Sequence, residues 1–258
     1  MHQRKTTANR KLSMYGFDLV SGSHNFFALL EFDITNLRSL LRERRIAGDG
    51  GSLFAFMLKA IAKCLEEFPE FNSMINLRRT TTFDEVDISI PIEVRIGGEI
   101  RNKQYVIRNA AAKSLKEITE EIDRSKNETA YRNGLVDSAA GQRLLDLLPG
   151  KLVVSFFRCL LKSHARVKKL SGTVFVTSVS MFSNASGYIL PFAGGPKAAS
   201  FAIGSAVKKP VVKDDQIVIR EMINITAIFN HDLIDGAPAA RFINRFRKYL
   251  ERDFGQLI

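Results

Sequence analysis

The sequence contains no tryptophan and only two cysteines, and both shortages narrow what it can encode. Cys64 and Cys159 stand in separate apolar stretches without the Cys and His spacings of a zinc site, so we expect neither a disulfide framework nor a metal. No apolar run approaches the ~20 residues of a membrane-spanning helix. The basic N-terminus MHQRKTTANRKLSMYG is not followed by the apolar segment of a secretory signal. We therefore expect a cytoplasmic protein.

Positive charge is the main bias in what is present. Lys and Arg number 38 against 27 Asp and Glu, which gives a formal net charge of +11 over 258 residues. These basic residues are spread along the chain without a nucleic-acid-binding signature, so no nucleic-acid partner is expected. Apolar residues make up 45% of the chain, an ordinary globular value. No repeat or Pro-rich linker divides the sequence, so residues 1–258 are predicted to form a single domain.

The first half of the chain mixes helix and strand patterns. Residues 26–33, FFALLEFD, predict a strand. A helix is predicted from Ser52, which can cap it, to the stop at Pro69. The other elements predicted here are a helix opening at residues 33–35, a strand pair over residues 86–107 around Gly97-Gly98, and a helix over residues 113–126.

An apolar segment at residues 139–165 follows. Leucine and phenylalanine dominate it, and Pro149-Gly150 interrupts it, which predicts an inserted pair of helices packed as a hairpin. Lys151, Arg158 and Lys162 also resemble the basic flank of an interfacial helix, so a role in binding a hydrophobic ligand or a membrane surface is the alternative. The packed hairpin is favoured, and membrane-surface contact is not expected.

Strand patterns dominate the rest of the chain. They are predicted at residues 173–179, 200–207, 216–220 and 223–230, before a final helix over residues 237–252. That helix is predicted to bury one stripe, formed by Ala240, Ile243, Phe246 and Leu250. The sum is an α+β chain.

The stretch INITAIFNHDLIDGAPAARF, residues 223–242, is the candidate for chemistry. An alternating apolar strand ends at His231, and Asp235-Gly236 then turns into a helix with Pro238 in its first turn. Imidazole has an unperturbed pKa close to neutrality, so it can take a proton from a thiol or alcohol and return it. Asp235, four positions further on, is either an orienting or a structural carboxylate. Taken alone, such a pair is more often structural than catalytic.

HDLIDG fits the motif HxxxDG, and the region resembles the catalytic core of the acyltransferase component of 2-oxo acid dehydrogenase complexes, a family related to chloramphenicol acetyltransferase. Other segments resemble that family in the same order: RKTTANR, NFFALLEFDIT, EEFPEFNS, FDEVDISIPIEV, SGTVFVTSVSMF and KAASFAIGSAVKKPVVKDDQIVIREM. The resemblance implies a chloramphenicol-acetyltransferase-like two-layer sandwich, in which helices pack on a mixed β-sheet.

The resemblance also implies roles for individual residues. His231 would be the general base that deprotonates a thiol or hydroxyl for attack on an acyl thioester. Thr177 would donate its hydroxyl to the oxyanion, and Ser178 stands where the family has Asn. Asp235, followed by the motif's Gly236, would be structural. Its partner would be an N-terminal arginine, either Arg4 or Arg10.

The family implies a homotrimer with the active site between subunits, so His231 and Thr177 would come from different chains. Further assembly of trimers is left open. Coenzyme A would be the substrate, and its phosphates give the excess positive charge a partner. Lys208 and Lys209 are candidate contacts for them, although a solvated basic turn is the favoured interpretation of this pair. The acyl acceptor would be a small molecule or a lipoyl-bearing protein.

Several features depart from the family pattern. Asn230 and Asp232 flank the histidine where dehydrogenase components usually have Asp and Arg. We expect a stand-alone core without a lipoyl-bearing domain. Our first hypothesis is acyl transfer between coenzyme A and a thiol such as dihydrolipoamide. The second is O-acetylation of a small hydroxyl compound. The third is a catalytically silent structural core.

Overall fold

The computed structural model describes residues 6, 8–20, 22–48, 50–76, 78–96, 99–127, 148–180, 186–191 and 195–258. Its helices are α1 (Ala8–Val20), α2 (Thr35–Ile46), α3 (Leu53–Glu67), α4 (Leu115–Asn127), α6 (Gly150–Leu161), α7 (His164–Ser171) and α8 (Gly236–Glu251), with short 3₁₀ helices η1 (Pro69–Asn72) and η2 (Phe254–Leu257). Its strands are β1 (Asn25–Asp33), β2 (Ser73–Asn76), β3 (Arg79–Thr82), β4 (Ile88–Ile96), β5 (Glu99–Ile107), β6 (Val174–Ser178), β7 (Ala199–Lys213) and β8 (Gln216–Asn230).

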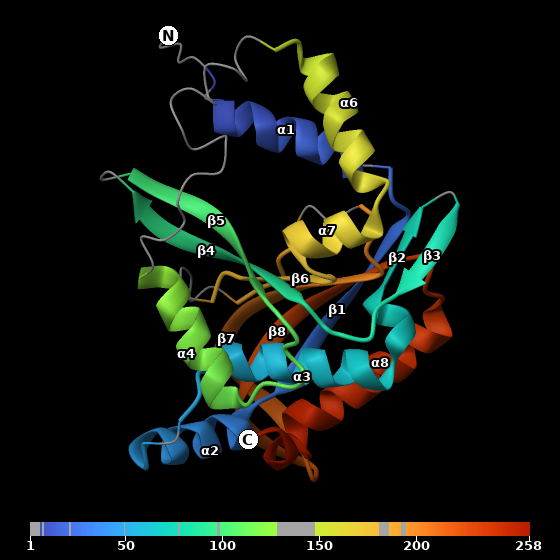
Figure 1. The fold of residues 1–258 in the computed structure, drawn as a ribbon. Coiled ribbons are helices and arrows are strands. Elements are labelled where there is room, and N and C mark those ends of the chain that lie inside the picture. The colour runs from blue at the N-terminus through green and yellow to red at the C-terminus, as the bar shows by residue number, and fades with distance from the viewer. Residues whose placement is uncertain are drawn as a thin grey trace, which may run out of the picture.

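Six strands form one mixed sheet in the order β1-β8-β7-β6-β4-β5 (Figure 1). β6 runs parallel to both β4 and β7, and the remaining neighbours are antiparallel. β2 and β3 form a separate hairpin beside the large sheet. This arrangement confirms the predicted α+β class with helices packed on a mixed sheet.

Helices α3, α4 and α8 cover one face of the large sheet, where the core lies (Figure 1). α3 is buried along most of its length, as its almost uninterrupted apolar sequence requires. Ser52 caps it as predicted, because its Oγ accepts from the Ala55 N–H at 3.1 Å, and the helix ends before Pro69. Under the end of β8 the core is aromatic. Phe71 stacks on Phe242 at 4.5 Å between ring centroids, and Phe229 lies 5.3 Å from Phe71.

The predicted stripe on the last helix is partly wrong. Ala240 is exposed, and the residues that α8 buries are Ala239, Phe242, Phe246, Tyr249 and Leu250. The larger rings set the rotation of the helix, because Phe242 and Tyr249 bury more apolar surface than Ala240 and Ile243 could.

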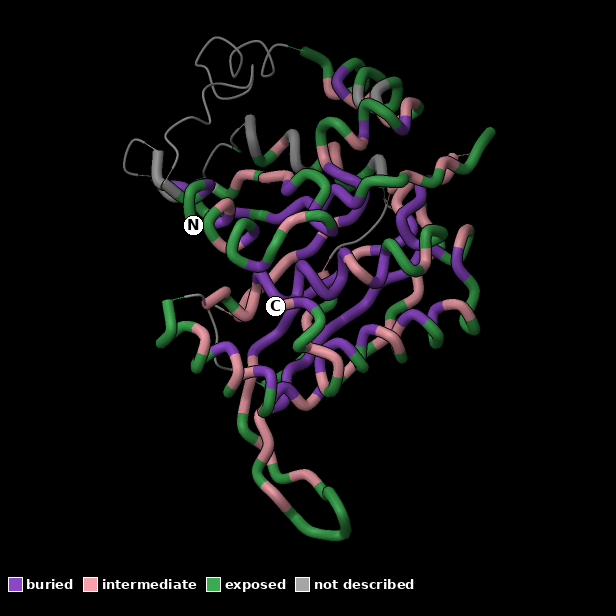
Figure 2. The backbone as a smooth tube through the Cα atoms, turned by 60° about the horizontal axis from the view of Figure 1, so that its bottom comes forward, coloured by how far each residue is buried: buried purple, intermediate pink, exposed green. Residues whose placement is uncertain are grey.

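β7 and β8 extend further than the sequence pattern predicted, and they form an arm that projects from the sheet (Figure 2). β7 continues through Pro210 to Lys213, although strand was expected only to residue 207. Residues 216–221 of β8, which precede Met222, do not pair with β1, so the arm's two strands pair only with each other. Asp214 and Asp215 make the turn with φ of 50° and 59°, which suits a two-residue hairpin.

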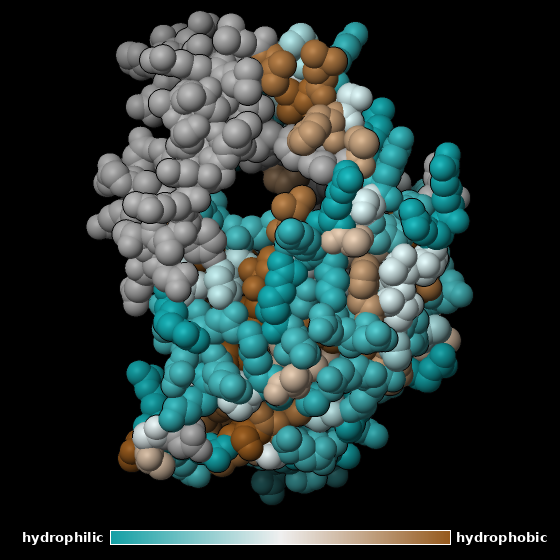
Figure 3. Space-filling view, viewed as in Figure 1, coloured by the Kyte–Doolittle hydropathy of each residue, from teal (hydrophilic) through white to brown (hydrophobic). Residues whose placement is uncertain are grey.

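α6 packs against α1 and contacts α7, so α1 and α6 stand away from the sheet (Figure 1). This confirms a helix after Pro149, whereas the helix predicted before Pro149 falls at residues 144–147, outside the described part. The apolar side chains at the top of Figure 3 belong to this region, where Leu152 and Phe156 are 59% and 62% exposed. Among the described residues no helix is long and apolar enough to cross a membrane.

Candidate active site

The corner between β8 and α8 presents the histidine of the HxxxDG motif. β8 is buried from Met222 to Asn230, and the chain then leaves the sheet at His231. The Asn230 Oδ1 accepts from the Asp232 N–H at 3.0 Å, which shapes the turn. α8 follows from Gly236, with Asp235 at its N-cap position. A buried strand therefore anchors the side chain that the turn exposes.

His231 is fixed through its backbone and through one ring contact. Its N–H donates to the His24 carbonyl at 2.7 Å, which continues the β1–β8 pairing by one residue. The Phe26 ring lies 5.2 Å from the imidazole centroid and 5.5 Å from Phe229. The imidazole itself is 57% exposed, so a ligand or a neighbouring protein can reach it.

Asp235 lies beside the histidine, as the four-residue spacing implied. Its Oδ1 is 3.6 Å from His231 Nδ1, and its side chain is 81% exposed. A carboxylate at Nδ1 favours a proton on that nitrogen, which leaves the Nε2 lone pair free. Asp232 is engaged separately, because its Oδ1 lies 2.8 Å from His24 Nδ1.

Thr177 and Ser178 lie at the C-terminal end of β6. Val174 and Val176 belong to the core, so the alternation of the strand turns Thr177 to the opposite face of the sheet. Thr177 is half-buried, and its hydroxyl bonds to no other residue in the part of the chain that the structure describes. The Ser178 hydroxyl instead lies 2.8 Å from the Ser180 hydroxyl.

Within one chain the structure does not bring Thr177 and His231 together. Thr177 is in register with Ala202 on β7, which is in register with Thr226 on β8. His231 lies five residues beyond Thr226. At about 3.3 Å per residue and about 4.8 Å per strand, the two Cα atoms are about 19 Å apart. The candidate base therefore lies at one end of the sheet, and the candidate oxyanion donor lies well inside it.

The lysines predicted to contact phosphate lie on the arm. Lys208 and Lys209 are in β7, in register with Glu221 and Arg220, so the favoured interpretation as a basic turn is wrong. The turn was predicted because Lys-Lys-Pro is typical of the end of a strand, whereas β7 continues through Pro210. The Lys209 ammonium forms an ion pair with Glu31.

The structure gives less information on the residues predicted to support the site, which are Gly236, Arg4 and Arg10. Gly236 begins α8, and a Cβ built there would meet no atom within 4 Å, so sterics within the chain do not require glycine. Arg10 is exposed on α1, and Arg4 lies outside the described residues.

Two residues at this corner of the sheet, Phe26 and Lys197, were missed from the sequence. Phe26 could have been inferred only by knowing that β1 pairs with β8. Lys197 bridges to Met74, and Ala198, the next residue, accepts from the Asn230 N–H at 2.9 Å. The Lys197 ammonium donates to the Ser171 carbonyl at 2.5 Å, and burial lowers its pKa to about 7. No spacing in the sequence signals this buried amine.

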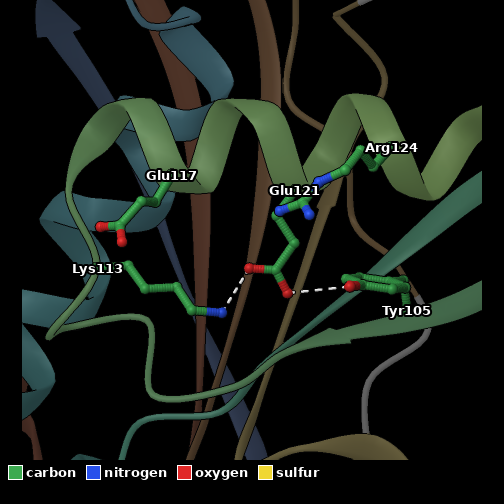
Figure 4. Close-up of a pocket in the computed structure, with 5 residues that line it drawn as sticks. All are labelled: Tyr105, Lys113, Glu117, Glu121 and Arg124. Carbon is green, nitrogen blue, oxygen red and sulfur yellow. Dashed lines mark hydrogen bonds and ion pairs between the residues drawn. The ribbon is translucent and has the colours of Figure 1, made fainter.

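A separate polar cavity of about 330 Å³ lies between β5 and α4 (Figure 4). Within it Glu121 accepts from the Tyr105 hydroxyl at 3.0 Å and pairs with Lys113 at 2.5 Å. The carboxylate is thus satisfied by the protein itself, and none of the predicted site residues lines this cavity. Among the described residues there is no cluster of three or more His, Cys, Asp or Glu side chains suited to a metal.

The family with the description "2-oxoacid dehydrogenases acyltransferase (catalytic domain)" matches residues 22–139 and 161–258. The chain belongs to this family. The lipoamide acyltransferase component of the branched-chain alpha-keto acid dehydrogenase complex of Bacillus subtilis (strain 168) is 26% identical over 231 residues, which are 87% of this chain and 46% of that protein. The chain spans about half the length of the curated relatives that it matches: 46%, 52% and 50% of three of them.

Solved structures agree with the predicted fold. A probable dihydrolipoamide acetyltransferase from Listeria monocytogenes 4b F2365 matches with a TM-score of 0.70 and 25% identity, covering 100% of this chain and 99% of that one. A chloramphenicol acetyltransferase matches with a TM-score of 0.51 and 15% identity over 96% of both chains, a likeness of fold alone. The predicted chloramphenicol-acetyltransferase-like sandwich is confirmed.

Proposed function

We propose that this acyltransferase domain moves an acyl group between coenzyme A and the thiol of dihydrolipoamide, with His231 as general base. The exposed imidazole at the end of a buried strand, with Asp235 3.6 Å from Nδ1, is the observation that carries the proposal. Membership of the acyltransferase family supports the reaction type, and the name of the Bacillus subtilis relative, a lipoamide acyltransferase component, supports the lipoyl acceptor.

The chemistry balances with the groups present. His231 Nε2 takes the proton of the attacking thiol, and the thiolate adds to the carbonyl carbon of the acyl thioester. The Thr177 hydroxyl donates a hydrogen bond to the resulting oxyanion. When the intermediate collapses, the carbon–sulfur bond of the original thioester breaks. The departing thiolate then takes the proton back from the imidazolium.

We further propose a homotrimer in which His231 of one subunit meets Thr177 of the next. The separation of about 19 Å within one chain supports a shared site, since a donor that far away cannot reach an oxyanion held at His231. Ser178, which is engaged with Ser180, is assigned no direct role. Residues 1–258 are proposed as one catalytic domain with an insertion at 139–165, which the break in the family match between residues 139 and 161 supports.

Complementation between two inactive variants tests both proposals. His231→Ala should lower kcat for dihydrolipoamide acylation by about 10²–10⁴-fold. Thr177→Ala should also lower it. If the two variants are unfolded together and refolded as a mixture, some interfaces will pair an intact His231 with an intact Thr177, and activity should return.

Each variant refolded alone is the control for that mixture. Full activity of His231→Ala would overturn the assignment of the base. A mixture no more active than its parts would overturn the shared site. Turnover of hydroxyl acceptors in place of dihydrolipoamide would identify O-acetylation instead, and an inactive wild type would identify a structural core.

A further inference from the structure

Asn76, at the end of β2, ties the tip of the β2–β3 hairpin to the turn between α6 and α7. Its Oδ1 accepts from the N–H groups of Arg78 and Arg79 at 3.0 and 3.2 Å. Its Nδ2 donates to the Lys162 carbonyl at 3.4 Å and to His164 Nε2 at 3.0 Å. One amide side chain therefore gathers residues that are 88 positions apart in sequence.

His164 closes the same junction and stays neutral. Its side chain is buried, and its Nδ1–H donates to the Thr81 hydroxyl at 2.8 Å, because Nε2 is the acceptor from Asn76. Burial and then the nearby positive charge of Arg79 lower the pKa of His164. Residues of the β2–β3 hairpin and of α7 therefore form the junction together. The positive charge at this place comes from the side chains around the junction.

Four exposed cations surround this junction: Arg78, Arg79, Lys162 and Arg166. Within the described part of the chain none of the four forms an ion pair, whereas the nearby Lys168 is paired with Glu85 at 2.9 Å. Residues 147–213 contain no Asp or Glu at all, so the sequence supplies no neutralising charge from α6 to the arm. Figure 3 shows hydrophilic side chains over the tip of the β2–β3 hairpin.

The cluster lies at the same end of the sheet as His231. The Asn230 N–H donates to the Ala198 carbonyl at 2.9 Å, and the Ala198 N–H donates to the Ser73 carbonyl at 2.9 Å. β2 is therefore next to the start of β7, and β7 is next to the end of β8. At about 4.8 Å per strand and about 3.3 Å per residue, Asn76 is about 12 Å from His231.

We propose that Arg78, Arg79, Lys162 and Arg166 form a phosphate-binding site that holds the phosphate groups of coenzyme A while its thiol reaches His231. Guanidinium groups bind phosphate oxygens in pairs, with charge-assisted hydrogen bonds. The pantetheine arm that separates the phosphates from the thiol is long and flexible enough to cover the distance to His231. This inference rests on the proposed function, because it names where that reaction's substrate is held.

Substrates that differ only in phosphate content test the site. With the double variant Arg78→Ala/Arg79→Ala, the KM for acetyl-CoA should rise by about tenfold or more. The KM for acetyl-pantetheine, which has no phosphate, should not change. Acetyl-3′-dephospho-CoA should show whether the 3′-phosphate or the diphosphate is the group that is bound. Arg247→Ala removes an exposed, unpaired cation of the described part of α8 and is the matched control, with wild-type KM for all three substrates.

A rise in KM that is equal for acetyl-CoA and acetyl-pantetheine would overturn the proposal, and so would no rise for either. If the double variant does not fold, Lys162→Ala/Arg166→Ala tests the site from the α6–α7 side. Calorimetric titration of coenzyme A and of pantetheine into each variant gives the same comparison without turnover. A wild type that binds coenzyme A through phosphate but transfers no acyl group would refute the proposed function and leave the site standing.

Discussion

The end of the central sheet that carries His231 and the middle of the sheet, which carries Thr177, differ in how they hold the candidate catalytic residue. At the His231 end, a buried strand, an aromatic core and a hydrogen-bonded turn position the imidazole, which projects outward. Thr177 instead lies inside the sheet, on a strand of five residues and on the face away from the core helices, with its hydroxyl unbonded within the described structure. His231 is thus fixed by its surroundings in the chain, whereas the Thr177 hydroxyl is left available to a ligand.

This difference agrees with the proposed shared site. His231 is held by its own strand and turn, but Thr177 lies about 19 Å away on the same sheet, so a small movement within the chain cannot bring the two residues together. Under the proposal, association between chains brings them together.

Apart from the loss of His231 itself, replacing Thr177 is expected to have the largest effect on this comparison. Thr177→Ala should lower kcat by about 10²–10³-fold, because it removes a donor to the oxyanion. Thr177→Ser keeps the hydroxyl and should retain most of the activity, which steady-state kinetics would show. Equal losses in both variants would mean that the methyl group, and not the hydroxyl, matters at this position.

The buried amine at the His231 end predicts a pH dependence of stability. Burial lowers the pKa of Lys197 to about 7, whereas a lysine in the unfolded chain titrates near ~10.4. The unfolded chain binds the proton more strongly over this range, so stability falls as the pH drops toward 7. Between pH 9 and pH 7 this group should cost the wild type about 2 kcal/mol of unfolding free energy.

Urea unfolding of Lys197→Gln at both pH values would measure that cost. The variant keeps a donor for the Ser171 carbonyl but does not titrate, so the difference between pH 9 and pH 7 should largely disappear. Lys213→Gln, at the exposed end of the arm, is the control and should retain the wild-type difference. An unchanged difference in Lys197→Gln would show that this amine is not the cause.

The smallest expected effect concerns the ring beside the base. Phe26→Leu keeps an apolar side chain but removes the aromatic contact at 5.2 Å from His231. An aromatic contact of this kind contributes about 0.5–1.5 kcal/mol, so kcat should fall by about two- to tenfold. Phe54→Leu, a partly buried ring on α3, serves as the control. If both variants keep wild-type kcat, the backbone alone orients the imidazole.

Local pattern was sufficient to predict much of the fold. The sequence predicted α3 from its apolar run, its cap at Ser52 and the stop at Pro69, because helix signals are local. The pairing of His231 with Asp235 could be predicted for the same reason, since the two residues are only four positions apart. The mixed-sheet sandwich and the family came from the resemblance of several segments in order.

Features that depend on pairing between distant segments were not predictable. The strand predicted for the arm ended too early because proline usually breaks a strand. Pro210 is tolerated here, where the two strands pair only with each other. Phe26 contacts His231 through the β1–β8 register, and Lys197 is placed by its bridge to Met74; no local pattern encodes either pairing. The cluster of Arg78, Arg79, Lys162 and Arg166 could not be predicted for a related reason. Asn76 brings the segments of Arg78 and Lys162 together from separate parts of the chain.

The arm of β7 and β8 has a consequence for how the protein behaves in solution. Val212, Ile217 and Ile219 on it are each more than 70% exposed, at 74%, 78% and 73%, and its strands leave their outer edges without a neighbouring strand of the same sheet. Open edges with apolar side chains pair readily with other chains. When association covers them, folding and assembly become linked by mass action, and the melting temperature rises with protein concentration. Dilution would then act on this protein as a mild denaturant.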